Sequence, residues 1–366
     1  RVAVVVFWLL LVVAFAAVAL AWRRGVRRRR RAREVIDDTE YLATLTALCQ
    51  GSVRRHFHAY GDIDWDDPAF SVTPNDPRWT LPSTDPLGRH PWYRSQPRDK
   101  QIAIGLARQA NVAKVAAQFE SILVRGLLGY AFRLPDRSPE FRYCVHESVE
   151  ECNHMMMFQE MVNRTGADVC GMPRWLRMFS SILPLAAGPM PHAFFFSVLA
   201  GEVPFDRTQT NILRESAPSP AILERIVAIH VAEEARHIGF AHSYLSRTVP
   251  REPRFNRFML ALYVPVVMRV FCDAFLVPPR SFFAQLGIPR SVRRQAFFGD
   301  PASRQALRDM FSDTRMLCHE IGLMNPVALV MWKACRIGGR PARYRGEPIR
   351  RVSDLGVEDA ADTEAA

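Results

Sequence analysis

The pattern of apolar and polar positions divides the chain into regions. Residues 2–22 are apolar without interruption, and 21 helical residues at about 1.5 Å each match a hydrocarbon core of roughly 30 Å. A weakly periodic stretch rich in proline, aspartate and tryptophan follows, which favours irregular structure wrapping a domain. From Gln101 onward, apolar residues recur at helical spacing, with no convincing two-residue alternation. We therefore predict an all-α chain with a transmembrane anchor at 1–22, an arginine-rich juxtamembrane segment at 23–33, an irregular lead-in at 34–100, a helical-bundle domain at 101–337 and a disordered tail at 338–366.

The basic residues after the apolar segment predict its orientation. Eight arginines lie between Arg23 and Arg33, and positive charge next to a membrane span favours the cytoplasmic side. A cleaved signal peptide is the alternative, because Ala19-Leu20-Ala21 resembles a cleavage site. In a signal peptide, however, the positive charge precedes the apolar run. We predict a single-pass protein of the cell membrane, with the main domain on the cytoplasmic side.

Charge and cysteine content narrow the classes of function. The formal net charge is +11, but without the arginine run it falls to about +3, an ordinary surface value. Nucleic-acid binding is therefore disfavoured. The seven cysteines are odd in number, scattered and without a C-x-x-C pair, which indicates reduced cytosolic thiols.

Serine and proline residues mark the predicted helix boundaries. Ser138-Pro139 and Ser219-Pro220 each combine a serine that can cap free amides with a proline that suits the first helical position. Pro204 is predicted to interrupt another helix and to free a backbone carbonyl one turn earlier.

Each of the two helices with a serine–proline start carries a Glu-x-x-His motif. Glu151 pairs with His154, and Glu234 with His237, so both side chains of a pair leave the same helix face. A single pair is weak evidence, because such pairs more often lie on a solvated surface. The second copy strengthens the signal, since each motif is preceded by a helix with one glutamate in an apolar stretch. These two glutamates are Glu120 and Glu202.

The order Glu, then Glu-x-x-His, repeated twice, is the ligand pattern of ferritin-like dimetal-carboxylate bundles. A glutamate on an apolar face is costly unless it is paired or binds a metal. Four carboxylates also balance the charge of two ferrous ions, so a buried centre would be formally neutral. Carboxylate and imidazole donors suit iron, with manganese as the alternative, and the lack of a thiolate cluster argues against zinc ribbons and iron–sulfur clusters.

A third histidine makes the pattern more specific. His230 precedes Glu234 by four positions and His237 by seven, so on an ideal helix the three lie within an arc of about 60°. The alternative is a buried structural histidine. The complete set resembles the p-aminobenzoate N-oxygenase (AurF-like) family of non-haem diiron oxygenases, over roughly residues 100–335. The residues that match the family's metal ligands are Glu120, Glu151, His154, Glu202, His230, Glu234 and His237.

The resemblance implies an oxidoreductase of the monooxygenase or N-oxygenase type. Such an enzyme activates O2 at two iron ions in a helical bundle and oxidises an arylamine nitrogen towards hydroxylamine or nitro. Its partners would be O2, a small-molecule amine and an electron donor that the sequence does not identify, and a homodimer is left open. Glu151 and Glu234 are assigned as bridging ligands, because each stands beside its own histidine. No catalytic residue beyond the metal ligands is assigned.

Two further groups of residues are weaker candidates. Glu147, four positions before Glu151, either contacts the metal ligands or belongs to a solvated acidic surface. Small and aromatic residues lie one or two turns before Glu120 and Glu202, where they either line an apolar substrate pocket or, the favoured alternative, take part in ordinary helix packing. These residues are Ala113, Ala116, Ala117, Phe195 and Val198.

Three other functions remain as alternatives. The membrane anchor suggests hydroxylation or desaturation of a lipid-like substrate at the same metal core. Iron storage or ferroxidase activity is disfavoured, because helical sequence continues well past the fourth ligand helix. A non-enzymatic membrane scaffold is disfavoured, because all the ligand positions would have to coincide by chance.

Overall fold

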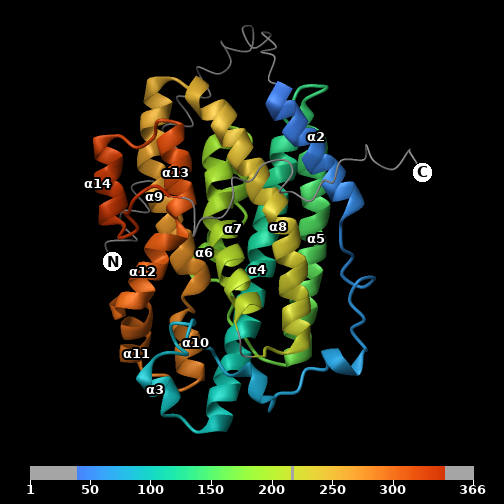
Figure 1. Ribbon diagram of the computed structural model, residues 1–366, viewed down its shortest axis with the longest axis vertical. Coiled ribbons are helices and arrows are strands. Elements are labelled where there is room, and N and C mark those ends of the chain that lie inside the picture. The colour runs from blue at the N-terminus through green and yellow to red at the C-terminus, as the bar shows by residue number, and fades with distance from the viewer. Residues whose placement is uncertain (1–38, 216–217, 343–366) are drawn as a thin grey trace, which may run out of the picture.

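The computed structural model describes residues 39–215 and 218–342 (Figure 1). Within these ranges the chain is helical and contains no strand, as predicted. The predicted anchor at 1–22 and the arginine-rich segment at 23–33 lie outside the described residues, as does the tail from residue 343 onward.

The elements fall into long helices and shorter turns. The long helices are α2 (Thr39–Arg54), α4 (Arg98–Ala131), α5 (Pro139–Thr165), α7 (Pro191–Arg214), α8 (Ala221–Thr248) and α9 (Arg254–Leu276). The shorter helices are α3 (Pro91–Arg94), α6 (Arg174–Phe179), α10 (Arg280–Gln285), α11 (Arg290–Arg294), α12 (Pro301–Met310), α13 (Ser312–Glu320) and α14 (Pro326–Ala334). The 3-10 turns are η1 (Pro68–Phe70), η2 (Pro77–Trp79), η3 (Leu183–Ala186) and η4 (Val249–Arg251), and η5 (Gln295–Gly299) is a π-helical turn.

Helices α4, α5, α7 and α8 form the central bundle (Figure 1). Helix α4 packs along α5, and α7 contacts both α8 and α9. Helices α4 and α7 also approach closely at Gly201, where an added Cβ would lie 2.0 Å from the ring of Phe119. Because Phe119 and Gly201 directly precede Glu120 and Glu202, the missing side chain lets these two glutamates come close together.

The lead-in is more regular than predicted. Its first described segment forms α2, which packs against α5 and α8, so the prediction of irregular structure is wrong for residues 39–54. Three threonines and a glycine in α2 have low helix propensity, and tertiary packing outweighs this weak local signal. Of the later lead-in elements, η1 contacts α8 and η2 contacts α4. The carbonyl of Trp79 lies so close to α4 that a Cβ at Gly105 would be 1.8 Å from its oxygen.

The two predicted serine caps do not form. The Ser138 hydroxyl donates to the backbone carbonyl three residues earlier (2.8 Å), although Pro139 does occupy the first turn of α5. Helix α8 begins after Pro220, so this proline is not its first helical residue. The backbone N–H of Ser219 donates to the carboxylate of Glu224 (3.0 Å). The two serines therefore bond to nearby oxygen atoms, and neither side chain caps the helix that follows.

The predicted break at Pro204 is also wrong, because α7 continues through this residue to Arg214. The proline removes one backbone donor, which normally weakens a helix interior. Here Pro204 is buried, and the packing of α7 against α8 and α9 outweighs the lost hydrogen bond. The hydroxyl of Thr208 donates to the Pro204 carbonyl (2.8 Å).

The helices after α9 cover one side of the bundle, so helical structure does extend beyond the fourth ligand helix, as predicted (Figure 1). One described segment, Arg254–Gln285, is long and apolar enough to cross a membrane. However, 67% of its most apolar stretch is buried inside the protein, and the core helix of a soluble protein can be equally long and apolar. All seven cysteines are free thiols, as predicted.

Candidate metal centre

The seven predicted ligands converge at the centre of the bundle. Helix α4 contributes one glutamate, α5 a glutamate and a histidine, α7 one glutamate, and α8 a glutamate and two histidines. Spacings of three and four keep the ligands of one helix on one inward face. All seven side chains are fully buried: Glu120, Glu151, His154, Glu202, His230, Glu234 and His237.

Two of these carboxylates, Glu151 and Glu234, lie between the motif helices. Glu151 lies 2.9 Å from His154 Nδ1 through one oxygen and 2.8 Å from His237 Nδ1 through the other. Glu234 Oε1 lies 3.3 Å from His237 Nδ1 and 3.7 Å from His154 Nδ1. Each carboxylate therefore reaches histidines of both α5 and α8, which a bridging ligand must do.

His230 joins the same cluster from α8. Its Nε2 lies 3.3 Å from Glu234 Oε1 and 3.5 Å from Glu120 Oε1. Among the described residues, neither ring nitrogen has a hydrogen-bond partner. A buried structural histidine normally has one, so the geometry favours a metal-ligand role over a purely structural one.

The side chains of Glu120 and Glu202 contribute unsatisfied oxygens. In the part of the chain that the structure describes, both oxygens of each carboxylate are buried without a hydrogen-bond partner. Donor atoms of Glu120, Glu202 and His230 lie within 4.8 Å of one another, as do those of Glu151, Glu202 and Glu234. Crowded buried carboxylates are costly unless a cation compensates their charge. The donor set therefore fits a metal centre of the kind that oxygen and imidazole ligands favour.

The crowding shifts the pKa values of the carboxylates in opposite directions. Burial, followed by the charges of Glu151 and Glu234, raises the pKa of Glu120 well above its usual value. Burial and the charge of Glu234 do the same to the pKa of Glu202. Burial also disfavours the charged form of Glu151, but His237 and His154 hold its pKa well below the usual range.

The pKa values of the three histidines are also shifted in opposite directions. Burial disfavours charged His154, but the adjacent Glu151 carboxylate raises its pKa to about 10. His237 also has a raised pKa, because the carboxylates of Glu151 and Glu234 outweigh its burial. Burial lowers the pKa of His230 to about 4, so its imidazole is neutral at pH 7. Protons thus balance the cluster's charge where no metal is bound, and a metal ion would displace them.

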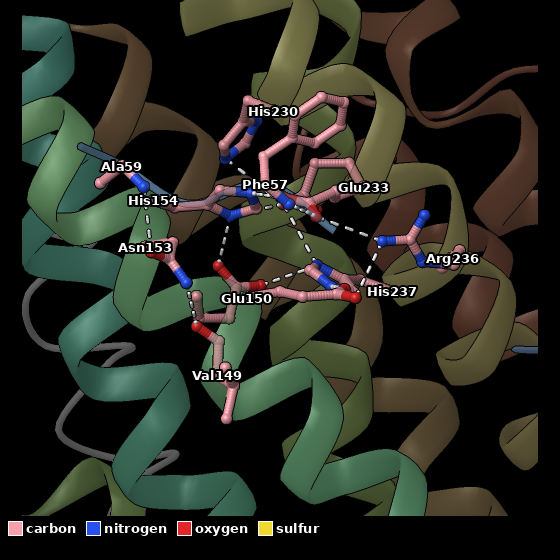
Figure 2. A network of polar contacts seen from close by, with 12 residues as sticks. Phe57, Ala59, Val149, Glu150, Asn153, His154, His230, Glu233, Arg236 and His237 are labelled. Carbon is pink, nitrogen blue, oxygen red and sulfur yellow. Dashed lines mark hydrogen bonds and ion pairs between the residues drawn. The ribbon is translucent and has the colours of Figure 1, made fainter. Parts of the chain in front are cut away.

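A second layer of carboxylates holds the two motif histidines (Figure 2). His237 donates through Nε2 to Glu150 Oε2 (2.7 Å), and His154 donates through Nε2 to Glu233 Oε2 (2.8 Å). Each acceptor comes from the opposite helix, so α5 and α8 orient each other's histidine. Such partners fix the ring and leave the other nitrogen, Nδ1, directed at the metal site.

Arg236 links the two outer carboxylates (Figure 2). Its Nη2 donates to Glu150 Oε1 (2.8 Å) and lies 3.4 Å from Glu233 Oε1. The lead-in adds a further donor, because the backbone N–H of Phe57 bonds to Glu233 Oε1 (3.1 Å). The network is thereby tied to the segment that precedes the bundle.

Sequence reasoning missed Glu150, Glu233 and Arg236. A signal was present, since a second glutamate precedes each motif and makes it Glu-Glu-x-x-His in both copies. Adjacent residues on a helix point about 100° apart, so the first glutamate cannot share the metal-facing side with the second. Its partner lies on the neighbouring helix, and only the packing identifies it.

Glu147 is fully buried, so the alternative of a solvated surface position is wrong. Its carboxylate has a donor atom within 4.8 Å of atoms from Glu151 and His237. Both of its oxygens lack a hydrogen-bond partner among the described residues. Burial raises the pKa of Glu147 well above its usual value and outweighs the opposite effect of His237. The side chain therefore borders the ligands, as its spacing suggested.

The suggested pocket residues lie in the packed core. Phe195 makes ring contacts with Tyr130, Phe240 and Tyr244 at centroid distances of 5.2, 5.3 and 4.4 Å. This is the ordinary helix packing that was the favoured alternative. The others, Ala113, Ala116, Ala117 and Val198, belong to the same hydrophobic cluster, with only Ala117 partly exposed.

A helical bundle with this buried set of four glutamates and three histidines has the features of the dimetal-carboxylate class. Residues 38–322, more than half of the chain, match the family model for P-aminobenzoate N-oxygenase AurF. The chain therefore belongs to this family of diiron oxygenases, which confirms the resemblance.

Mycobacterial relatives match nearly the whole chain. It is 60% identical over 328 residues to uncharacterized protein MT0908 of Mycobacterium tuberculosis, which covers 90% of this chain and 96% of the relative. The identity and coverage are the same for uncharacterized protein Mb0909 of Mycobacterium bovis.

Proposed function

We propose that this protein is a membrane-anchored non-haem diiron oxygenase that N-oxygenates an arylamine. One observation carries the proposal: a fully buried cluster of glutamates and histidines, several of whose oxygen and nitrogen atoms are unsatisfied, in a member of the p-aminobenzoate N-oxygenase family. The anchor is the apolar segment at 2–22, with the bundle on the cytoplasmic side.

Donor atoms of Glu120, Glu202 and His230 lie within 4.8 Å of one another, as do those of His154, His230 and Glu234. Together with Glu151 and His237, these side chains would hold two iron ions. The two central carboxylates, which contact histidines of both α5 and α8, would bridge them. When bound, the irons would supply O2 activation and electron transfer.

The surrounding residues would orient the metal ligands and exclude bulk water from the centre. The outer carboxylates Glu150 and Glu233 fix the rings of His237 and His154 through hydrogen bonds of 2.7 and 2.8 Å. Every proposed ligand is fully buried, which keeps bulk water from the reacting groups. Neutral His230 adds a nitrogen donor without changing the charge balance.

Product analysis tests the proposed reaction. The iron-loaded protein, chemically reduced and supplied with O2, would be incubated separately with p-aminobenzoate and with a fatty acyl substrate. We expect hydroxylamine or nitro products from the arylamine, and none from the Glu234→Ala variant. Hydroxylated or desaturated acyl products alone would replace N-oxygenation by lipid oxidation. Products from neither substrate would contradict the proposed activity on both classes.

A further inference from the structure

A cavity of about 420 Å³ lies outside the metal centre, among α9, η5, α12 and α14. Its volume falls in the range of roughly 300–1,000 Å³ that small-molecule sites occupy. No acidic residue and none of the proposed metal ligands lines it. Its cationic lining residues are Arg269, Arg304, Arg308, Lys333 and Arg336.

Most of this positive charge is uncompensated. Arg269 is paired with Asp273 (Nε to Oδ2, 2.9 Å), and this pair contributes little net charge. The adjacent acid of α12, Asp309, accepts a hydrogen bond from Gln305 (2.8 Å). The other four cations that line the cavity form no hydrogen bond or ion pair through their side chains with any described residue: Arg304, Arg308, Lys333 and Arg336.

The fold brings these four cations together from separate places in the sequence. Helix α12 supplies Arg304 and Arg308 one turn apart, the end of α14 supplies Lys333, and Arg336 follows that helix. They are therefore not one local run of charge on a solvated helix face. Like charges repel, and a concave site concentrates their field, so an anion placed among them would be stabilised.

Aromatic and aliphatic side chains form the remainder of the wall. Phe297 is buried, and the partly buried Phe298 and Leu307 also line the cavity. The guanidinium carbons of Arg269 and Arg293 lie 6.0 and 5.5 Å from the ring centre of Phe298. The cavity thus offers an apolar surface next to a cationic one.

The backbone is irregular at two places in this wall. The two phenylalanines lie on η5, a π-helical turn, and such turns are frequent at functional sites. Arg336 has a left-handed φ of 60°, which is uncommon for a residue other than glycine. Arg336 follows the C-cap of α14, Cys335, and lines the cavity.

We propose that this cavity is a second ligand site, for a molecule in which a phosphate or diphosphate group is attached to an apolar or aromatic part. Guanidinium groups bind phosphate oxygens through paired hydrogen bonds, and the phenylalanines would contact the rest of the ligand. Nucleotides and phospholipid headgroups share this chemistry. A hollow of this size suits such a molecule better than the flat surface of a protein partner.

Calorimetric titration of the full-length, metal-loaded protein in neutral detergent tests the site. The probes are pyrophosphate, adenosine 5′-diphosphate and dihexanoyl phosphatidylglycerol below its micelle concentration. The pocket variant is Arg304→Gln combined with Lys333→Gln. Its matched control is Arg174→Gln combined with Arg177→Gln, because these exposed arginines of α6 lie outside the cavity. All variants retain the arginine run at 23–33, so its background binding is common to them.

We expect the nucleotide or the lipid to bind more tightly than pyrophosphate, and the one that does identifies the source of the ligand. The pocket variant should bind it at least tenfold more weakly, as expected for lost hydrogen bonds between charged groups. The control variant should bind like the wild type. Failure of all three probes to bind, tightest binding by pyrophosphate, or equal weakening in both variants would overturn the proposal. Circular dichroism would verify that both variants are folded.

Discussion

His230 differs from the other two histidines of the cluster in how its ring is held. His154 and His237 each donate to an outer carboxylate, whereas no described residue forms a hydrogen bond with either ring nitrogen of His230. Burial keeps this imidazole neutral, with a pKa of about 4. Its side chain therefore contributes a nitrogen donor but no charge to the centre.

Replacing His230 should have a different effect from replacing Glu234. His230→Ala should keep most of its iron but lose most oxygenation, because the charge balance is unchanged while one coordination position opens to water. Glu234→Ala removes a central negative charge and should leave the site empty or half filled. Iron content and product yield would be measured side by side. A His230→Ala enzyme with unchanged product yield would show that His230 is only a packed core residue.

Metal loading should release protons. In the metal-free cluster the pKa values of His154 and His237 are raised, which favours the doubly protonated, positively charged form of both rings. The raised pKa values of Glu120 and Glu202 favour the protonated form of these carboxyls as well. Binding of divalent ions should therefore release protons, and the affinity should increase with pH. Titration of the apoprotein with ferrous iron under anaerobic, weakly buffered conditions measures this. Release of fewer than one proton would contradict the assignment.

At the scale of secondary-structure elements, reciprocal hydrogen bonds between α5 and α8 position the metal ligands. Each helix supplies the carboxylate that orients the other helix's histidine. Arg236 connects the two carboxylates and is itself almost completely buried. The two helices are therefore held in register at the metal ligands, and not only by apolar packing.

Weakening one of these bonds should lower metal affinity without unfolding the chain. Glu150→Gln preserves the size of the side chain but removes the charge that orients His237 and makes it more basic, so iron affinity should decrease roughly 10- to 100-fold. The control is Glu160→Gln on the same helix, whose carboxylate pairs with Arg164 away from the cluster. Competition with a chelator measures both. Equal iron affinity in the Glu150 variant and the control would refute the orienting role.

The elements also explain which features the sequence could predict. The ligands on α5 and α8 were predictable because a spacing of three or four on one helix fixes a shared face. Glu150 and Glu233 were not, because their partners lie on a different helix. The helical conformation of α2 and the uninterrupted path of α7 through Pro204 depend on tertiary packing, which outweighs the local propensities.

At the scale of the whole molecule, the bundle should function without its N-terminal segment. No proposed ligand precedes Glu120, and the family match begins at residue 38. Deleting residues 1–33 should therefore release a soluble protein that keeps its iron, whereas the full-length chain should partition into membranes. Fractionation and iron analysis of both forms test this. A full-length chain recovered in the cytosolic fraction would contradict the proposed anchor.

The central claim is that the buried cluster binds two iron ions. Elemental analysis of full-length protein purified from iron-replete cells measures this directly, and Glu234→Ala provides the metal-poor control. We expect close to two irons per chain, because seven ligands are too many for one octahedral ion. One zinc per chain, or no metal after both aerobic and anaerobic preparation, would contradict the claim.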